Sequence, residues 1–408
     1  MKIFFSAGEP SGDIHGANLI RALRSLQPEV RCVGFGGPKM KEAGLEQHFD
    51  LTSLAVMWVG EVLANLRKFF ALADDAEAYF HAEHPDAVVL IDYPGFNWHI
   101  AKRAKRLGIP VFYYSPPQVW SWKQGRVKKL RRLTDLIFSG LPFEARWLRE
   151  HGCRVECTGH PFFDEVRNHP KNTEFMAKLS ENRSVVGLLP GSRTGEVHRN
   201  FPIFWNTAVR ICRVLPNVRF AVAAFREEHA QWIRDFVETQ KGLETQNRSE
   251  TQDRSGFPQL EIFVQHTPEI IQASDCCLSV SGSVSLELLH HAKPTVIAYH
   301  VSRFGWFAQW LCRRVRFITL VNLLAVENPF RSFNPEIRPD SQDARDAIFP
   351  EYLTCRDRSE WIAGDLLRWL QNEDERMECV RRLEALRREF GQDGAARNAA
   401  EKILTFLD

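Results

Sequence analysis

The sequence predicts an α/β protein whose two domains each contain a parallel sheet and face each other across a cleft. The chain has 408 residues, more than a single ordinary core accommodates. Through the first domain, short apolar runs alternate with helical patterns, as parallel strands joined by helical crossovers do. The alternation restarts after a polar stretch at 167–183. We therefore expect a first domain over 1–166, a second over 167–358 and a helical tail over 359–408.

Six short runs of the first domain are predicted to be strands. They read KIFFSAG (2–8), RCVGFGG (31–37), AVVLID (87–92), IPVFYYS (109–115), DLIFSGL (135–141) and VECTGHP (155–161). The helix predicted over 13–26 has apolar residues on one stripe, and the helix predicted over 98–108 ends at Gly108. These elements alternate in the order that a parallel sheet requires.

Five runs of the second domain are predicted to be strands. They read SVVGLLPGSR (184–193), VRFAVAAF (218–225), LEIFVQ (260–265), CCLSVSGS (276–283) and PTVIAY (294–299). The segment 239–256 contains the near-duplication ETQNRS and ETQDRS and almost no apolar residues, so we expect a mobile surface loop there.

Bulk properties exclude several classes of protein. The formal net charge is only +2, whereas a nucleic-acid binder normally has a larger basic excess. No apolar run approaches the roughly 18 residues that a membrane span needs, and the N-terminus becomes acidic too soon for a signal peptide. The nine cysteines lack metal-type spacing, which indicates reduced thiols in a cytoplasmic protein.

A buried strand ends in a carboxylate at AVVLID. The run is short, β-branched and without a 3.6-residue period, so it predicts a strand buried on both faces. Because an unpaired charge is costly to bury, we expect Asp92 at the carboxyl end of the strand, where open α/β sheets bind ligands. The residues alone leave two roles open for Asp92, a catalytic base or a turn-capping carboxylate before Pro94.

The segment SAGEPSGDIHG (6–16) is a second candidate site, because small residues there let a ligand approach a helix N-terminus. We expect Ser11 or Asp13 to cap this helix. The spacing is not that of a dinucleotide site. Glu9 has the wrong charge for phosphate, so it would hydrogen-bond a sugar hydroxyl or orient a nearby base. A purely structural turn is the alternative.

The loop LLPGSRTGE (188–196) of the second domain has features of an anion site. A buried strand opens there through Gly191 and Ser192 into Arg193, whose planar guanidinium suits a diphosphate.

The loop SVSGSVSLELL (279–289) is similar. Its strand ends at Ser281, Gly282 and Ser283, whose N–H groups and hydroxyls could form an anion nest at a helix start. Glu287 follows on the same helix face and could reach ribose hydroxyls. An ordinary helix N-cap is the alternative for this turn.

These loops together suggest a sugar nucleotide held by the second domain across from Asp92 in the first. No D-x-D sequence occurs, so we expect neither a metal ion nor another cofactor. Arginine and helix dipoles would neutralise the leaving group.

Eight segments resemble, in order, the lipid-A-disaccharide synthase family. They read AGEPSGDIHGANLIRAL, AVMWVGEVL, IDYPGFN, SPPQVWSWKQGRVKK, LPFE, TGHP, LLPGSR and SGSVSLEL, and they span most of residues 1–300. The resemblance implies a GT-B glycosyltransferase (family 19) with two Rossmann-like domains, the first facing acceptor and membrane and the second binding the UDP-sugar.

The resemblance also implies an activity and roles for residues. The activity is an inverting transfer from UDP-2,3-diacylglucosamine to 2,3-diacylglucosamine 1-phosphate (lipid X), which yields lipid A disaccharide 1-phosphate and UDP. Asp92 matches the carboxylate of the family's I-D-x-P motif, Glu9 the glutamate of A-G-E-x-S-G-D, and Arg193 the arginine of LPGSR. Asn322 resembles the asparagine of the family's P-N-L-L-A segment.

The sequence departs from the family after this segment. Val321 replaces the proline, and residues 327–348 intervene before IFPEYL. We expect a longer surface loop there rather than a lid, and the role of Glu351 stays open. Two alternative functions also remain open, another GT-B UDP-sugar enzyme (a transferase or an epimerase) and a non-catalytic UDP-sugar sensor.

Acylated substrates lie in a bilayer, so the resemblance implies a peripheral enzyme on the cytoplasmic side of the inner membrane, with oligomers possible. The segment 57–72 is the candidate docking helix, although the same pattern fits a helix packed on its own sheet. Basic residues at 126–132 would add attraction to anionic lipid. The predicted lipid contacts are Val59, Val62, Leu63, Leu66, Phe69 and Phe70.

Overall fold

The structure is a computed structural model that describes residues 1–55, 59–167, 172–181, 183–247, 257–330, 337, 340–391 and 394–408. The side chains of 55, 59–66, 167 and 244–247 lie outside this description. The chain forms two compact units, Met1–Asn168 with Phe390–Asp408, and His169–Glu389.

The first unit is built on a seven-stranded sheet in the order β3-β2-β1-β4-β5-β6-β7, with every neighbouring pair parallel. The central strands are buried along their whole length, which explains their continuous apolar sequences. The strands are β1 (Lys2–Ala7), β2 (Arg31–Gly36), β3 (Glu46–Asp50), β4 (Ala87–Ile91), β5 (Val111–Tyr114), β6 (Leu136–Ser139) and β7 (Val155–Cys157).

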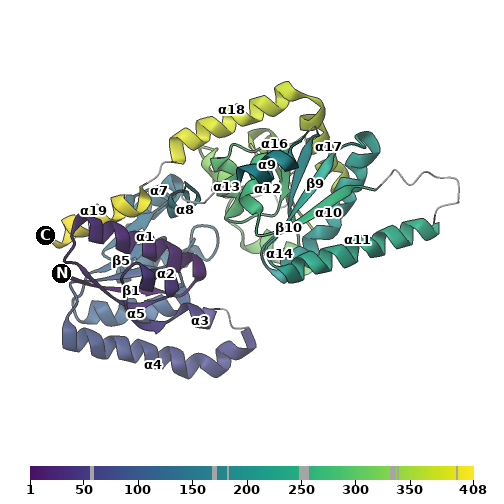
Figure 1. Ribbon diagram of the computed structural model, residues 1–408. Coiled ribbons are helices and arrows are strands. Elements are labelled where there is room, and N and C mark those ends of the chain that lie inside the picture. The colour runs from purple at the N-terminus through teal and green to yellow at the C-terminus, as the bar shows by residue number, and fades with distance from the viewer. Residues whose placement is uncertain are drawn as a thin grey trace. The chain divides into compact units, whose positions relative to one another are not determined.

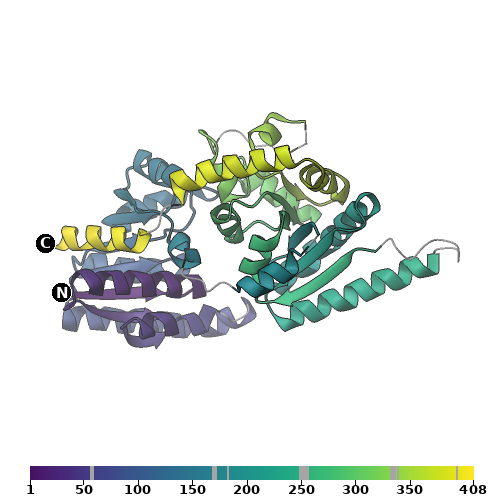
Figure 2. The ribbon, with the colours of Figure 1, turned by 45° about the horizontal axis from the view of Figure 1, so that its top comes forward.

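Helices cover this sheet (Figure 1). They are α1 (Pro10–Leu26), α2 (Pro38–Glu42), α3 (Thr52–Ala55), α4 (Val59–Glu83), α5 (Pro94–Arg106), α6 (Val127–Leu133), α7 (Pro142–Glu150), α8 (Pro161–Arg167) and α19 (Ala395–Leu407), with a short 3-10 turn at Gln124–Arg126. The last helix, α19, lies beside α1 (Figure 2), and Ala399, Ala400 and Ile403 join Ile20 and Leu23 in the core.

The second unit contains a six-stranded parallel sheet in the order β10-β9-β8-β11-β12-β13. The strands are β8 (Val185–Leu189), β9 (Arg219–Ala224), β10 (Gln259–Val264), β11 (Cys276–Ser279), β12 (Thr295–His300) and β13 (Glu351–Thr354). Its helices are α9 (Thr173–Leu179), α10 (Thr194–Val214), α11 (Glu227–Asn247), α12 (Thr267–Ala273), α13 (Val284–His290), α14 (Arg303–Cys312), α15 (Leu320–Leu324), α16 (Gln342–Asp346), α17 (Ser359–Gln371) and α18 (Glu373–Phe390).

The structure has a strand at every run predicted as one. It adds two edge strands, β3 and β13, which are short or polar and therefore lack an apolar signal. The stretch 359–408, predicted as one tail, is divided, because α17 and α18 lie in the second unit and α19 packs on the first.

Two local predictions were wrong. The segment 239–256 was predicted to be a loop, but α11 continues to Asn247, so its first half is helical, and 248–256 lies outside the described residues. Neither Ser11 nor Asp13 caps α1, which begins at Pro10 after Glu9. Asp13 instead accepts hydrogen bonds from the backbone N–H groups of Gly37, Lys39 and Met40 and so caps α2.

Candidate active site

The turn after β4 holds Asp92 in a strained backbone conformation. Asp92 and Tyr93 both have positive φ, 44° and 46°, before α5 begins at Pro94. Left-handed backbone in a residue other than glycine costs about 1–3 kcal/mol and persists only where the surroundings impose it. Two consecutive residues of this kind at the carboxyl end of a central strand mark the turn as a functional candidate.

Two buried side chains impose this conformation. Asn97 donates through Nδ2 to the carbonyls of Asp92 (2.7 Å), Ile91 (3.2 Å) and Ser6 (3.2 Å). Its Oδ1 accepts from the Ser6 hydroxyl at 2.7 Å, and the Tyr113 hydroxyl also donates to the Asp92 carbonyl at 2.7 Å. Because both bonds end on the Asp92 carbonyl, they fix the main chain and do not engage the side-chain carboxyl.

The Asp92 carboxyl is half-buried, and this burial raises its pKa, against a hydrogen bond from the backbone of Tyr93 that lowers it. A carboxylate with a raised pKa binds a proton more strongly, which favours a general base. Asp92 therefore combines a place at the carboxyl end of a central strand with a raised carboxyl pKa.

Glu9 lies beside this turn. The ends of β1 and β4 are in register, with Ala7 opposite Ile91, so Glu9 and Asp92 each follow the end of a neighbouring strand. Burial raises the pKa of Tyr93, and the nearby charge of Glu9 raises it further. Glu9 thus lies near Tyr93, the chain neighbour of Asp92, at one edge of the sheet.

Gly8 makes room for the Tyr93 ring. A Cβ at this position would lie 2.3 Å from Cδ1 of Tyr93, which no side chain could tolerate. Phe96 and Phe69 pack around the same ring, with centroids 6.4 and 6.3 Å away. The small residues of this loop were predicted to admit a ligand, whereas Gly8 admits a neighbouring aromatic side chain.

Glu144 forms a buried support that sequence reasoning missed, although it lies within the LPFE segment. It accepts hydrogen bonds from Trp120 Nε1 (2.7 Å) and the Ser139 hydroxyl (2.5 Å). Burial raises the pKa of Glu144 to about 7, against the lowering effect of these two bonds. Glu144 therefore ties the loop that carries Trp120 to the end of β6.

Two histidines at the same end of the first sheet are neutral. Burial lowers the pKa of His15 to about 4 and that of His160 to about 3, and the proximity of His15 contributes to the latter shift. His15 follows Asp13 in α1, and His160 precedes α8. Neither ring contributes positive charge near the Asp92 turn.

In the second unit, the turn after β8 presents Arg193 to solvent. Gly191 has φ 118°, and a Cβ there would lie 2.9 Å from Cβ of Glu196. Arg193 is the N-cap residue of α10, and 84% of its side chain is exposed. Its ion pair with Glu196 is long at 3.5 Å, so the guanidinium can turn to a ligand.

In the turn after β11, the serine hydroxyls have other partners than the predicted anion. The Ser281 hydroxyl donates to the Ile318 carbonyl at 2.6 Å, so its proton is used within the protein. Gly282 and Ser283 are exposed, and Ser285 rather than Ser283 closes the turn, by donating to the Gly282 carbonyl at 2.7 Å. Glu287 is half-buried one turn into α13.

Asn322 is fully buried, and protein groups meet its hydrogen-bonding capacity. Nδ2 donates to the Phe349 carbonyl (2.8 Å) and to Glu351 Oε2 (3.0 Å). Oδ1 accepts from the N–H groups of Ile348 (3.0 Å) and Phe349 (2.9 Å). In this structure Asn322 therefore joins α15 to the start of β13 and does not present its side chain to a ligand.

Glu351 completes a network that reaches the Ser281 turn. Its carboxylate accepts from Ile318 N–H (2.7 Å), Thr319 N–H (3.3 Å) and the Thr319 hydroxyl (2.8 Å). Burial raises the pKa of Glu351, and these hydrogen bonds oppose the rise. The Ile318 carbonyl also accepts the hydrogen bond of the Ser281 hydroxyl. Glu351 and Asn322 therefore support the Ser281 turn through Ile318.

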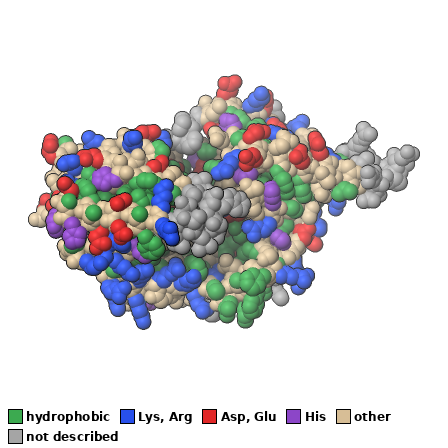
Figure 3. All heavy atoms as spheres, turned by 90° about the horizontal axis from the view of Figure 1, so that it is seen from below, with side chains coloured by type: hydrophobic (Ala, Val, Ile, Leu, Met, Phe, Trp, Pro, Cys, Tyr) green, Lys and Arg blue, Asp and Glu red, His purple; other side chains and the backbone are tan. Residues whose placement is uncertain are grey.

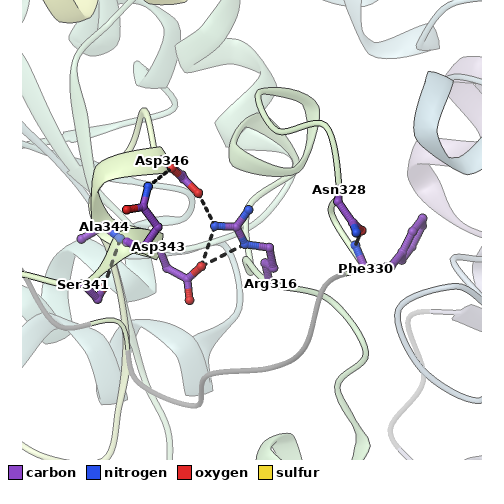
Figure 4. Close-up of polar contacts among 8 residues, drawn as sticks. Arg316, Asn328, Phe330, Ser341, Asp343, Ala344 and Asp346 are labelled. Atoms are coloured by element: carbon purple, nitrogen blue, oxygen red, sulfur yellow. Dashed lines mark hydrogen bonds and ion pairs between the residues drawn. The ribbon is translucent and has the colours of Figure 1, made fainter.

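Arg316 anchors the described part of the 327–348 insertion (Figure 4). Its guanidinium is buried and binds Asp343 (2.9 and 2.6 Å) and Asp346 (2.5 Å) of α16. Its backbone N–H donates to the Pro329 carbonyl at 3.0 Å. One residue thus fixes both sides of the insertion against the segment that precedes α15.

Across the described residues, no group of three or more His, Cys, Asp or Glu side chains has metal-binding geometry. Within the same part of the chain, no helix is long and apolar enough to cross a membrane.

The comparisons with known proteins decide the family. The model of the lipid-A-disaccharide synthetase family matches residues 3–347. The chain belongs to the lipid-A-disaccharide synthase family. Lipid-A-disaccharide synthase of Myxococcus xanthus is 32% identical over 409 residues, covering all of this chain and 97% of the relative. That of Nitrosococcus oceani is 31% identical over 406 residues, covering 98% and 95%.

Solved structures confirm the GT-B fold. UDP-GlcNAc 2-epimerase from Neisseria meningitidis, bound to UDP-GlcNAc, matches with a TM-score of 0.59 at 12% identity over 100% of this chain and 99% of its own. MurG from Acinetobacter baumannii matches with a TM-score of 0.52 at 12% identity, covering 99% of each chain. At this identity the likeness concerns the fold alone.

Family membership confirms the activity expected from the motifs. A lipid-A-disaccharide synthase is a hexosyltransferase that uses a UDP-sugar, and its reaction belongs to lipid A biosynthesis. The family match does not favour an epimerase or a non-catalytic sensor.

The structure describes the side chains of only two of the six predicted lipid contacts, Phe69 and Phe70. The side chains of Val59, Val62, Leu63 and Leu66 lie outside the described residues. Phe69 is half-buried against Tyr93 and Phe96, and Phe70 is 48% exposed. Phe69 therefore packs against the Asp92 turn. Phe70 is open to solvent.

Proposed function

We propose that the donor is UDP-2,3-diacylglucosamine and that the acceptor is 2,3-diacylglucosamine 1-phosphate, giving lipid A disaccharide 1-phosphate and UDP. The first unit provides the residues that act on the acceptor, and the second binds the UDP-sugar. The strained turn at Asp92 carries this proposal, because it fixes a half-buried carboxylate at the ligand edge of a parallel sheet.

Asp92 acts as the general base. It takes the proton of the acceptor's 6-hydroxyl as that oxygen bonds to the anomeric carbon of the donor. The bond from that carbon to the diphosphate oxygen breaks at the same time, with inversion, and UDP leaves with the electron pair. General-base assistance contributes about 10²–10⁴ in rate. Glu9, beside Tyr93, orients this arrangement.

The diphosphate binds in the second unit. Arg193 contributes the cation, and Gly191, Ser192, Gly282 and Ser283 offer backbone N–H groups or hydroxyls at exposed turns. Ser281 shapes its turn through the Ile318 carbonyl, and Glu287 approaches the ribose. Asn322 has a positioning role, since its hydrogen bonds all go to the protein.

The same chemistry suggests where the enzyme acts. Both proposed sugars carry acyl chains, so we place the enzyme on the cytoplasmic side of the inner membrane as a peripheral protein. Neither a metal ion nor another cofactor has a part in the proposed steps.

A two-by-two assay tests the substrates. Acylated and non-acylated UDP-glucosamine are each combined with acylated and non-acylated glucosamine 1-phosphate, and UDP release and product mass are measured. Product from the doubly acylated pair alone supports the proposal. Equal turnover of the non-acylated pair would mean that the enzyme serves water-soluble sugars, and UDP-sugar binding without product would contradict transfer.

A further inference from the structure

Helix α14 of the second unit presents a continuous apolar face to solvent. Phe304 is 81% exposed, Phe307 51%, Trp310 44% and Leu311 56%. Their spacing places them on one side of the helix, and the rings of Phe307 and Trp310 are 5.4 Å apart. Single exposed apolar residues are ordinary, whereas a contiguous group marks an interaction surface.

The helix takes no part in the core of its unit. None of its ten residues is buried, although its sequence, RFGWFAQWLC, is among the most apolar of the chain. It is nevertheless well formed, because the Ser302 hydroxyl caps it by accepting from Gly305 N–H at 3.0 Å. Trp306 is half-buried, whereas the other four large apolar side chains are exposed, and a helix that exposes four such side chains is expected to have a partner that buries them.

Charge identifies the kind of partner. The segment 303–316 contains four arginines and no acidic residue, and Arg303 and Arg314 are exposed at the two ends of the apolar face. Figure 3 shows hydrophobic side chains gathered at the surface with Lys and Arg side chains beside them. Aromatic side chains flanked by cations are typical of helices that lie in the interface of an anionic bilayer.

The position of α14 fits such a role. It follows the carboxyl end of β12, and the Gly191 and Ser281 turns follow the carboxyl ends of β8 and β11 in the same parallel sheet. The apolar helix thus emerges from the sheet edge at which the UDP-sugar is proposed to bind, where a diacylated donor would need lipid contact.

We propose that the exposed face of α14 docks the second unit on the surface of an anionic lipid bilayer. This contact is separate from the segment 57–72 of the first unit. The choice of a bilayer as partner rests on the proposed function, because that function makes both substrates lipids.

Vesicle flotation tests the proposal with the full-length protein. The variant Phe304→Ser/Phe307→Ser/Leu311→Ser should partition at least tenfold less onto vesicles of phosphatidylcholine with phosphatidylglycerol. Its thermal unfolding should stay cooperative and its UDP affinity unchanged, since no buried contact is lost. The matched control Val214→Ser/Leu243→Ser/Met377→Ser removes three exposed apolar side chains elsewhere and should partition like wild type.

A charge variant tests whether the flanking arginines contribute to docking. Arg303→Gln/Arg314→Gln should reduce partitioning on the anionic vesicles, with no effect on pure phosphatidylcholine. If the triple variant unfolds, the single change Phe304→Ser, at the most exposed position, still has to lower partitioning by a few-fold.

Two outcomes would overturn the proposal. Either the triple variant floats with the vesicles as the control does, or wild type is a dimer that the triple variant converts to a monomer without any change in partitioning. The second result would make the face a contact between two copies. Partitioning and substrate turnover are separate readouts, so docking without product formation would reject the proposed function and leave the lipid contact in place.

Discussion

Replacing Asn97 by Ala should loosen the turn that holds Asp92. The substitution removes four hydrogen bonds, two of 2.7 Å and two of 3.2 Å, and leaves Ser6, Ile91 and Asp92 with fewer partners in a buried place. At about 0.5–1.5 kcal/mol each, and with the longer pair near the lower limit, the loss is about 2–4 kcal/mol of unfolding free energy.

The same change should act on catalysis. The left-handed backbone at Asp92 and Tyr93 then has only the Tyr113 hydroxyl to oppose about 1–3 kcal/mol of strain per residue. The carboxylate would shift, and misplacement by about 1 Å can lower the rate by about 10². We expect kcat to fall at least tenfold while UDP affinity stays within twofold, because UDP is assigned to the second unit.

Urea unfolding, steady-state kinetics and UDP titration measure the three quantities. Tyr113→Phe is the matched control, since it removes one of the two bonds to the same carbonyl and should cost only about 1 kcal/mol. The reasoning is refuted if Asn97→Ala has the stability and the kcat of wild type, because the turn would then hold without this side chain.

Three further predictions concern other parts of the molecule. The folded pKa of Glu144, about 7, lies above the ordinary 4.5, so its contribution to stability is complete below pH 4.5 and is lost as the pH rises through 7. Wild type should therefore lose up to about 3 kcal/mol more than Glu144→Gln between pH 4.5 and 8, and parallel urea-unfolding data for the two proteins would contradict this. Arg193→Ala should weaken UDP binding at least tenfold, since a charge-assisted contact is worth about 1.5–3 kcal/mol, whereas Arg234→Ala on α11 should have no effect; equal UDP affinities by calorimetry would remove Arg193 from the site. EDTA should leave turnover unchanged, and activity that is lost and then restored by Mg²⁺ would overturn the metal-independent mechanism.

The strand pattern and the place of Asp92 were predictable because both depend on local sequence. A buried parallel strand is apolar throughout, so a polar residue at its end indicates the sheet edge. The left-handed turn was not predictable, because it depends on hydrogen bonds from other elements, such as the one from Tyr113, which is distant in sequence. Asn97 gave only the weak signal of an amide in the first turn of a helix.

Other features depend on contacts between distant segments. Asp13 looked like a cap for its own helix but caps α2, because the chain returns to it at Gly37. The exposure of the apolar residues of α14 was not predictable, since a sequence cannot show whether a partner element will cover them. Glu351 and Asn322 meet only because β13 pairs with β12 beside α15.

Turnover of Asp92→Asn tests the central claim most directly. The substitution is nearly isosteric and keeps the carbonyl that Asn97 and Tyr113 hold, but its side chain cannot accept a proton. With doubly acylated substrates we predict a loss of about 10²–10⁴ in kcat, wild-type UDP affinity and wild-type cooperative unfolding. A folded variant that binds UDP and turns over at the wild-type rate would show that Asp92 is not the base.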